Sequence, residues 1–194
     1  AKREHLMALT GHGDYIDSMD LANHGRLAVS GSRDGSLRLW SLTRGRMLWC
    51  LNEPAEDRGF AAVAFSPDGR MFAAGAYDGT FTVRETLSRK RCLPVSERNG
   101  VVRTIAFSPD GKLVAFTSDT REIMLWDTRT GQEVQSFKGH RAQIHGLAFS
   151  PDGGMLASSA SDSSALLWRV PTAQDLQRDL TAAERQQAIE HLGS

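Results

Sequence analysis

Short stretches in which apolar and polar side chains alternate recur along the chain and predict a protein built from β-strands. IHGLAF at 144–149 alternates in this way, as a strand with two different faces does. MLASSAS at 155–161 and SALLWRV at 164–170 read as the next two strands, and QEVQSF at 132–137 precedes them. Turn residues stand between these strands, which favours antiparallel hairpins.

The same pattern returns along the sequence at a nearly constant interval. The phrase FSPDG starts at Phe65, Phe107 and Phe149, so it recurs every 42 residues, and a weaker copy, LANHG, occupies 21–25. In each unit the turn chemistry of Pro, Asp and Gly predicts a hairpin between the first two strands. Further markers keep the same register: Gly-His pairs at 11–12 and 139–140, and a Trp at the end of the third strand at positions 40, 126 and 168.

These markers together resemble the WD40 repeat, a four-stranded blade of a β-propeller. The resemblance implies an all-β protein of four four-stranded antiparallel blades, with an N-terminal strand completing a last blade and a short C-terminal helix. It looks most like the C-terminal propeller portion of larger bacterial-type WD40 proteins. The propeller region is expected at 1–170, with repeats at approximately 9–51, 52–95, 96–137 and 138–170.

Both ends of the sequence depart from the repeat. Residues 3–9 align with a fourth strand and are expected to belong to a neighbouring or closing blade. Residues 171–194 are expected to form a helical tail, because TAAE at 181–184 has capping-box spacing. Three arrangements remain open: part of a larger propeller, two chains giving eight blades, or a four-blade ring that closes alone.

The family resemblance also implies a hydrogen-bonded tetrad of His, Ser, Asp and Trp within a blade. By position, the first unit supplies His12, Ser30, Asp34 and Trp40, and the last supplies His140, Ser158, Asp162 and Trp168. A Ser, a His and an Asp could also form a hydrolase triad. Recurrence on the repeat period, without a nucleophile elbow, favours the structural interpretation.

The two middle units lack complete tetrads. The second has Asp78, but Ala74, Arg84 and Glu56 replace Ser, Trp and His. The third keeps Trp126, while Phe116, Thr120 and Arg98 fill the other positions. Both units are therefore expected to rely on apolar packing and to be the softer part of the array.

The resemblance places a protein-binding surface on the face that carries the loops entering each first strand and the turns following each second strand. The candidates by position are Tyr15, Asp17, Arg33, Tyr77, Arg103, Asp119, Gln143 and His145. Tyr and Arg are common interface anchors, so Tyr15, Arg33, Tyr77 and Arg103 lead this set. The expected partner is a protein or peptide, with possible self-association into a larger closed propeller.

Composition excludes several other functions. The 23 Lys and Arg residues balance the 23 Asp and Glu residues, which argues against a nucleic-acid partner. No apolar run approaches a membrane span, and two cysteines without metal-ligand spacing argue against a zinc site. We therefore expect no catalytic residues, no metal, no cofactor and no membrane association, and a cytoplasmic location.

The predicted function is a non-enzymatic protein–protein interaction scaffold within a larger or multi-chain propeller. The alternative is a regulatory or sensory propeller segment of a multi-domain bacterial-type protein whose effector domain lies outside this chain.

Overall fold

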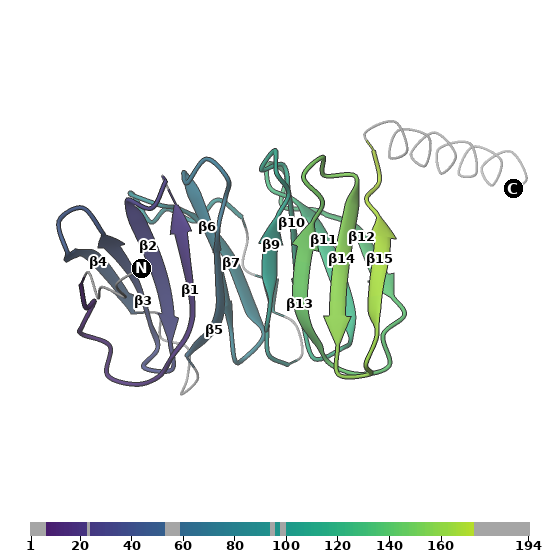
Figure 1. The fold of residues 1–194 in the computed structure, drawn as a ribbon, viewed down its shortest axis with the longest axis horizontal. Helices are drawn as coiled ribbons and strands as arrows, with labels where there is room; N and C mark the ends of the chain where they lie inside the picture. Colours follow the sequence, from purple (N-terminus) through teal and green to yellow (C-terminus); the bar gives the residue numbers. More distant parts are fainter. Residues whose placement is uncertain (1–6, 23, 53–58, 94–95, 98–99, 173–194) are drawn as a thin grey trace, which may run out of the picture.

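The described part of the chain folds into four antiparallel β-sheets that stand side by side in chain order (Figure 1). This computed structural model describes residues 7–22, 24–52, 59–93, 96–97 and 100–172. Each sheet is a simple meander in which consecutive strands pair, so each corresponds to one sequence repeat. The predicted all-β class with propeller-type blades is confirmed.

The first two sheets contain four strands each. The first holds β1 (Ile16–Ala22), β2 (Leu27–Ser32), β3 (Ser36–Ser41) and β4 (Arg46–Asn52). The second holds β5 (Phe60–Phe65), β6 (Met71–Ala76), β7 (Thr80–Glu85) and the short β8 (Ser96–Glu97). Because β8 pairs with β7, the second sheet reaches past residue 95, where the sequence predicted the third unit to begin.

The other two sheets differ in strand number within the described residues. The third holds β9 (Ile105–Phe107), β10 (Leu113–Thr117), β11 (Glu122–Asp127) and β12 (Glu133–Lys138). The last holds only β13 (Ile144–Phe149), β14 (Met155–Ala160) and β15 (Ala165–Arg169). Residues 7–9 of the predicted strand 3–9 are not in a strand, and residues 3–6 lie outside the described part. The predicted tail helix also lies outside it, apart from the non-helical residues 171–172.

FSPDG forms the hairpin between the first two strands of each sheet that carries it. In the second sheet, the Ser66 hydroxyl donates to Asp68 Oδ1 over 2.6 Å, and the Gly69 N–H donates to the Ser66 carbonyl over 2.8 Å. Gly69 has φ +67°, a left-handed conformation that glycine adopts without strain. The equivalent glycines, Gly111 and Gly153, have φ +72° and +73°, so all three hairpins share one geometry.

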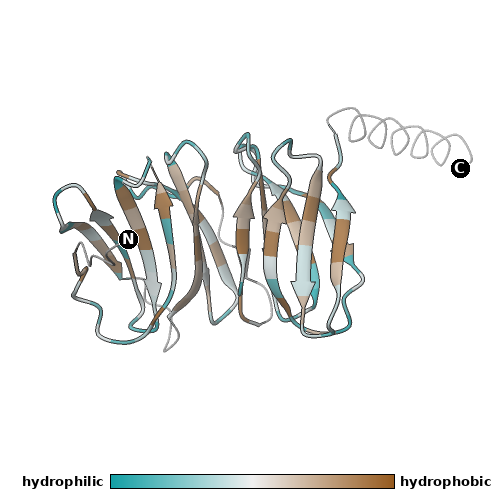
Figure 2. Cartoon of the chain, in the orientation of Figure 1, coloured by the Kyte–Doolittle hydropathy of each residue, from teal (hydrophilic) through white to brown (hydrophobic). Residues whose placement is uncertain are grey.

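Apolar side chains fill the spaces between neighbouring sheets. Hydrophobic residues are spread along the strands of every sheet (Figure 2). Val29, Leu37 and Leu39 of the first sheet pack against Phe72 and Ala74 of the second. The second and third sheets meet through Phe81, Val83, Val114 and Phe116, and the third and fourth through Ile123, Leu125 and Leu156. Burial therefore joins each repeat to its neighbours, as repeat architectures require.

Candidate functional site

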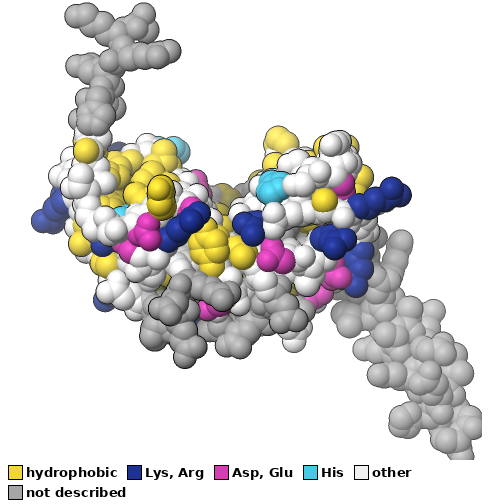
Figure 3. All heavy atoms as spheres, turned by 90° about the horizontal axis from the view of Figure 1, so that it is seen from below, with side chains coloured by type: hydrophobic (Ala, Val, Ile, Leu, Met, Phe, Trp, Pro, Cys, Tyr) yellow, Lys and Arg dark blue, Asp and Glu magenta, His cyan; other side chains and the backbone are white. Residues whose placement is uncertain are grey.

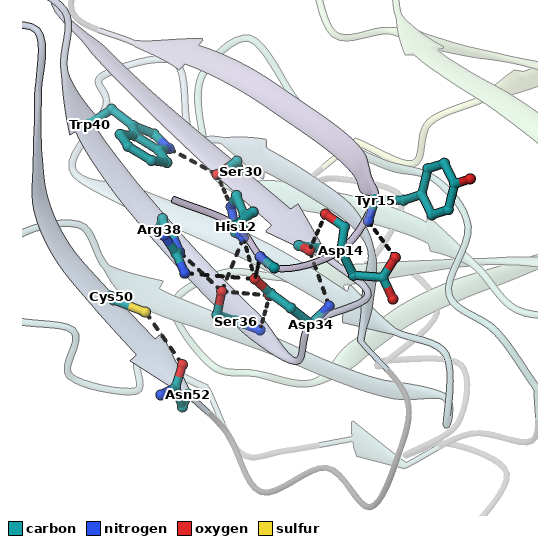
Figure 4. Close-up of polar contacts among 12 residues, drawn as sticks. His12, Asp14, Tyr15, Ser30, Asp34, Ser36, Arg38, Trp40, Cys50 and Asn52 are labelled. Carbon is teal, nitrogen blue, oxygen red and sulfur yellow. Dashed lines mark hydrogen bonds and ion pairs between the residues drawn. The ribbon is translucent and has the colours of Figure 1, made fainter. Parts of the chain in front are cut away.

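The four predicted residues of the first tetrad lie together, on strands and loops that the repeat brings side by side (Figure 4). The Trp40 indole N–H donates to Ser30 Oγ over 2.8 Å, and Ser30 Oγ lies 2.7 Å from His12 Nε2. His12 Nδ1 lies 2.9 Å from Asp34 Oδ2. Since an ionised carboxylate only accepts, we assign the proton to Nδ1, so that each group donates to the next from Trp40 to Asp34.

The last sheet repeats this arrangement. The Trp168 N–H donates to Ser158 Oγ over 2.8 Å, His140 Nε2 lies 2.7 Å from Ser158 Oγ, and His140 Nδ1 lies 3.2 Å from Asp162 Oδ2. The structure therefore brings all eight tetrad residues into two sets of nearly equal geometry. Ser30 is fully buried, and its oxygen is occupied by Trp40 and His12, which leaves no room for a substrate at this hydroxyl.

Two further side chains complete these sets, and the sequence analysis missed them. Ser36 Oγ donates to Asp34 Oδ1 over 2.6 Å, and Ser164 Oγ donates to Asp162 Oδ1 over 2.5 Å. The signal was present, because a Ser follows two residues after the Asp in both complete units. Partial burial acts to raise the pKa of Asp34, but hydrogen bonds from Ser36, the Gly13 N–H and His12 outweigh it and hold this pKa well below its usual value.

The second and third sheets have different side chains or different contacts at the tetrad positions. Arg84, at the second Trp position, is buried and donates from Nη1 to the Arg89 carbonyl over 2.9 Å. Trp126 Nε1 has no hydrogen-bond partner in the described part of the chain. Its ring instead contacts Phe116 edge-on with centroids 5.6 Å apart, while Phe81 and Phe116 stack at 3.9 Å.

Four residues of the predicted binding surface converge at one end of the first two sheets. We call Tyr15, Asp17, Arg33 and Tyr77 the Arg33 cluster. The Arg33 guanidinium donates to Asp17 from Nε over 2.9 Å and from Nη2 over 3.2 Å, and it lies 5.5 Å from the ring centroids of both Tyr15 and Tyr77. The Tyr77 hydroxyl donates to Asp17 Oδ2 over 2.9 Å, which joins the two sheets.

Contacts within the Arg33 cluster shift the pKa values of Asp17 and Tyr77. The hydrogen bond from Arg33 is the largest influence on Asp17 and lowers its pKa, with a further contribution from Tyr77. Burial and the neighbouring Asp17 raise the pKa of Tyr77. The cluster therefore carries an Arg–Asp ion pair beside the neutral phenol of Tyr77 at ordinary pH.

Three of the other four predicted surface residues form a separate group on the third and fourth sheets. We call Arg103, Asp119 and Gln143 the Asp119 cluster. Arg103 Nε lies 3.3 Å from Asp119 Oδ1, and Gln143 Nε2 donates to the same oxygen over 2.9 Å. His145 contacts Ser161 instead and joins neither cluster. Figure 3, which looks onto this end of the sheets, shows basic, acidic and hydrophobic side chains standing side by side across it.

Comparison with known proteins decides the family. The family model described as "WD domain, G-beta repeat" matches residues 3–41, 50–83, 90–127 and 131–169, well over half of the chain. The chain belongs to the WD40-repeat family. This confirms the resemblance inferred from the spacing of FSPDG, Gly-His and Trp.

The curated relatives of this WD40 chain are longer proteins. It is 34% identical over 70 residues to the small ribosomal subunit protein RACK1y of Oryza sativa, covering 36% of the chain and 20% of the relative. It is 31% identical over 102 residues to the eukaryotic translation initiation factor 3 subunit I of Candida albicans, covering 47% and 28%. The chain thus spans less than a third of the length of these relatives.

Two solved structures of computationally designed proteins share the fold of this WD40 chain. The Ika4 structure matches with TM-score 0.75 and 23% identity, covering 88% of this chain and all of that one. The Ika8 structure matches with TM-score 0.73 and 24% identity, covering 85% of this chain and 49% of that one. Four WD40 blades of this arc therefore correspond to about half of the Ika8 chain.

The described residues form neither a membrane-spanning helix nor a metal-binding cluster. No helix there is both long enough and apolar enough to cross a membrane. No three His, Cys, Asp or Glu side chains there gather closely enough to hold a metal ion.

Proposed function

We propose that this WD40 chain is a non-enzymatic scaffold for protein–protein interaction and acts as part of a larger or multi-chain propeller. The observation that carries the proposal is the Arg33 cluster, in which an exposed Arg stands between two Tyr rings at the loop end of the sheets. Tyr and Arg are enriched among the few residues that carry most of the binding energy of protein interfaces. The proposed partner is a protein or peptide.

The geometry of the Arg33 cluster is suited to binding because its side chains are already held in place. Two hydrogen bonds to Asp17 and two ring contacts restrict Arg33 before any partner arrives. Ordering a free arginine on binding costs about 0.5–1.5 kcal/mol. A preorganised arginine avoids much of this cost, while Tyr15 stays largely exposed and available for contact.

The Asp119 cluster supplies a second proposed contact region on the same end of the molecule. Its Arg, Asp and Gln side chains offer polar contacts, and His145 lies on the neighbouring strand β13. A partner that spans both clusters would touch all four blades. The names of the relatives, a ribosomal subunit protein and a subunit of an initiation factor, fit a role within assemblies and a cytoplasmic location.

Neither nucleic acid nor catalysis is part of the proposal. The chain carries equal numbers of acidic and basic residues, which argues against a nucleic-acid partner. Ser30, His12 and Asp34 are hydrogen-bonded to one another, and Ser30 is buried, which argues against a catalytic triad. The alternative, a regulatory or sensory propeller segment whose effector domain lies outside this chain, would use the same surface.

The test compares two arginines at opposite ends of the sheets. The wild-type chain, Arg33→Ala and Arg70→Ala are each used to capture proteins from an extract of the organism that encodes the chain. Arg70 is the matched control, because it also faces an Asp, at 3.8 Å, but lies in the FSPDG hairpin at the other end. The captured protein is then identified and its affinity for each variant measured by calorimetry.

We expect Arg33→Ala to weaken binding by at least about thirtyfold, as loss of an interface hot spot does. Arg70→Ala should leave the affinity unchanged. Equal binding by all three chains would show that the contact surface is elsewhere.

A further inference from the structure

Among the described residues, the two outermost blades each have one apolar face that no other blade covers. In the first blade, Ser18 and Asp20 of β1 face the second blade, where they bond Val63 and Phe65. The alternate residues Met19 and Leu21 point the other way, and they are 47% and 56% exposed. We call Ile16, Met19 and Leu21 the leading face.

The last blade shows the same feature on its opposite side. Leu156 and Val170 face the third blade, where they join its core. Met155 and Leu167 point away from that blade, and they are 49% and 70% exposed. We call Met155, Ala157, Ser159, Ala165 and Leu167 the trailing face.

The repeat register shows that both faces occupy positions that are interfaces elsewhere in the molecule. Positions equivalent to Ile16, Met19 and Leu21 hold Phe60, Val63 and Phe65 in the second blade, and all three are buried against the first blade. Positions equivalent to Met155, Ala165 and Leu167 hold Leu27, Leu37 and Leu39 in the first blade, where Leu37 and Leu39 are fully buried. Each exposed face therefore continues an interface that the chain already builds three times.

The internal interfaces show which side chains one position of the trailing face can carry. Gly31 of β2 lies so close to the second blade that an added Cβ would sit 2.9 Å from Phe60 Cβ and 3.0 Å from Val63 Cγ1. Gly75 stands in the same relation to Val102, the counterpart of Phe60 in the third blade. The third blade itself carries the larger Thr117 at this position, where it is buried, and the trailing face carries Ser159. A serine at this position of the trailing face therefore lies within the range of side chains that the internal interfaces accommodate.

We propose that a second copy of this chain covers both faces, with the trailing face of each copy against the leading face of the other. This inference rests on the multi-chain part of the proposed function and names its partner. The two faces differ from each other, so the contact runs head to tail and gives either a ring or an open filament. The four blades match 49% of the Ika8 chain at TM-score 0.73, so two copies would supply about the length of that whole chain. Two copies would then close a ring through two contacts between a trailing and a leading face, which we call seams.

The test uses a pair of opposite charges across the proposed seam. Ser159 corresponds to Gly31 and Met19 to Val63, so Ser159→Glu on one copy should lie beside Met19→Lys on the other. Both positions are exposed on the strands that carry them, so the substitutions leave the internal core untouched. Masses are measured by light scattering, with far-UV circular dichroism to check that each variant is folded.

We expect the wild type to show twice the chain mass of 21.3 kDa, and each single variant to show 21.3 kDa, because each places a charge in both seams of its dimer. Mixing the two variants in equal amounts should restore the double mass. In the mixed ring, one seam is wild type and the other pairs Glu with Lys. Leu87→Glu is the control, because Leu87 is also exposed, at 75%, but lies outside both faces; it should keep the double mass.

A wild-type mass of one copy would mean that something else covers these faces, such as further blades of a longer chain or an unrelated protein, and would overturn the proposal. Open-ended masses, or folded variants whose mixture stays monomeric, would overturn it as well. The outcome is separate from that of the capture experiment. A monomer whose partner binding depends on Arg33 would refute the second copy and leave the scaffold function standing.

Discussion

The outer and middle blades are stabilised by different interactions at equivalent positions of the repeat. In the first and last blades, hydrogen bonds connect Trp, Ser, His and Asp, with Trp168 bonded to Ser158 over 2.8 Å. Between the second and third blades, Phe81 and Phe116 stack at 3.9 Å and Trp126 packs edge-on against them. The hydrogen bonds of a polar tetrad are directional, so they fix the positions of the strands and loops that carry its members. The aromatic cluster removes more apolar surface from water.

This difference changes one expectation from the sequence. The incomplete tetrads predicted that the middle blades are the softer part of the array. The structure shows that these blades are covered on both faces and hold fully buried Phe72, Phe81 and Phe116. Stability in a repeat array sums the contribution of each unit and its interfaces. We therefore expect the interfaces of the middle blades to offset their missing hydrogen bonds.

The largest expected effect tests the aromatic cluster directly. Phe116→Ala should lower the free energy of unfolding by about 3–5 kcal/mol, because it removes a fully buried ring and leaves a cavity between two blades. Chemical denaturation measures the change, with Leu87→Ala at an exposed position as the control. If the loss is smaller than that of Trp40→Ala, the middle blades are the softer part, as the sequence predicted.

A smaller effect separates the two kinds of tryptophan. Trp168→Phe keeps an aromatic ring but removes the N–H that donates to Ser158, and it should cost about 1 kcal/mol more than Trp126→Phe. Trp126 has no hydrogen-bond partner for its N–H among the described residues, so its replacement loses only ring volume. Thermal unfolding of the two variants gives the difference. Equal losses would show that the tetrad hydrogen bond adds nothing to stability.

The smallest expected effect concerns acid. Because the folded-state pKa of Asp34 is depressed, its contribution to stability is complete above the ordinary Asp pKa of about 3.9 and is lost as the pH falls below that value. Asp34→Asn should therefore be less stable than the wild type at pH 6 and should lose less stability between pH 5 and pH 2. Urea unfolding at several pH values measures both slopes. Parallel curves would show that Asp34 does not contribute in this way.

The resemblance to WD40 repeats implied the tetrads, and the register of FSPDG and Trp assigned their members to positions in this chain. The same resemblance placed the binding-surface candidates on one end of the sheets. Sequence reasoning missed Ser36 and Ser164, although their spacing from Asp34 and Asp162 repeats. It also did not find that Tyr77 bonds Asp17, because those residues are 60 positions apart and belong to different blades.

By itself, the sequence determined the repeat, the turns and the pairing order within each sheet. These features depend on the alternation of apolar and polar residues and on local backbone preferences, such as that of Gly for positive φ. Both can be read from residues that are close together in the sequence. Only the tertiary structure decided which faces of the blades are covered and which candidate residues touch. Burial and side-chain contact depend on how one blade stacks on the next, so Leu39 is buried while its counterpart Leu167 stands exposed at the same position of the repeat.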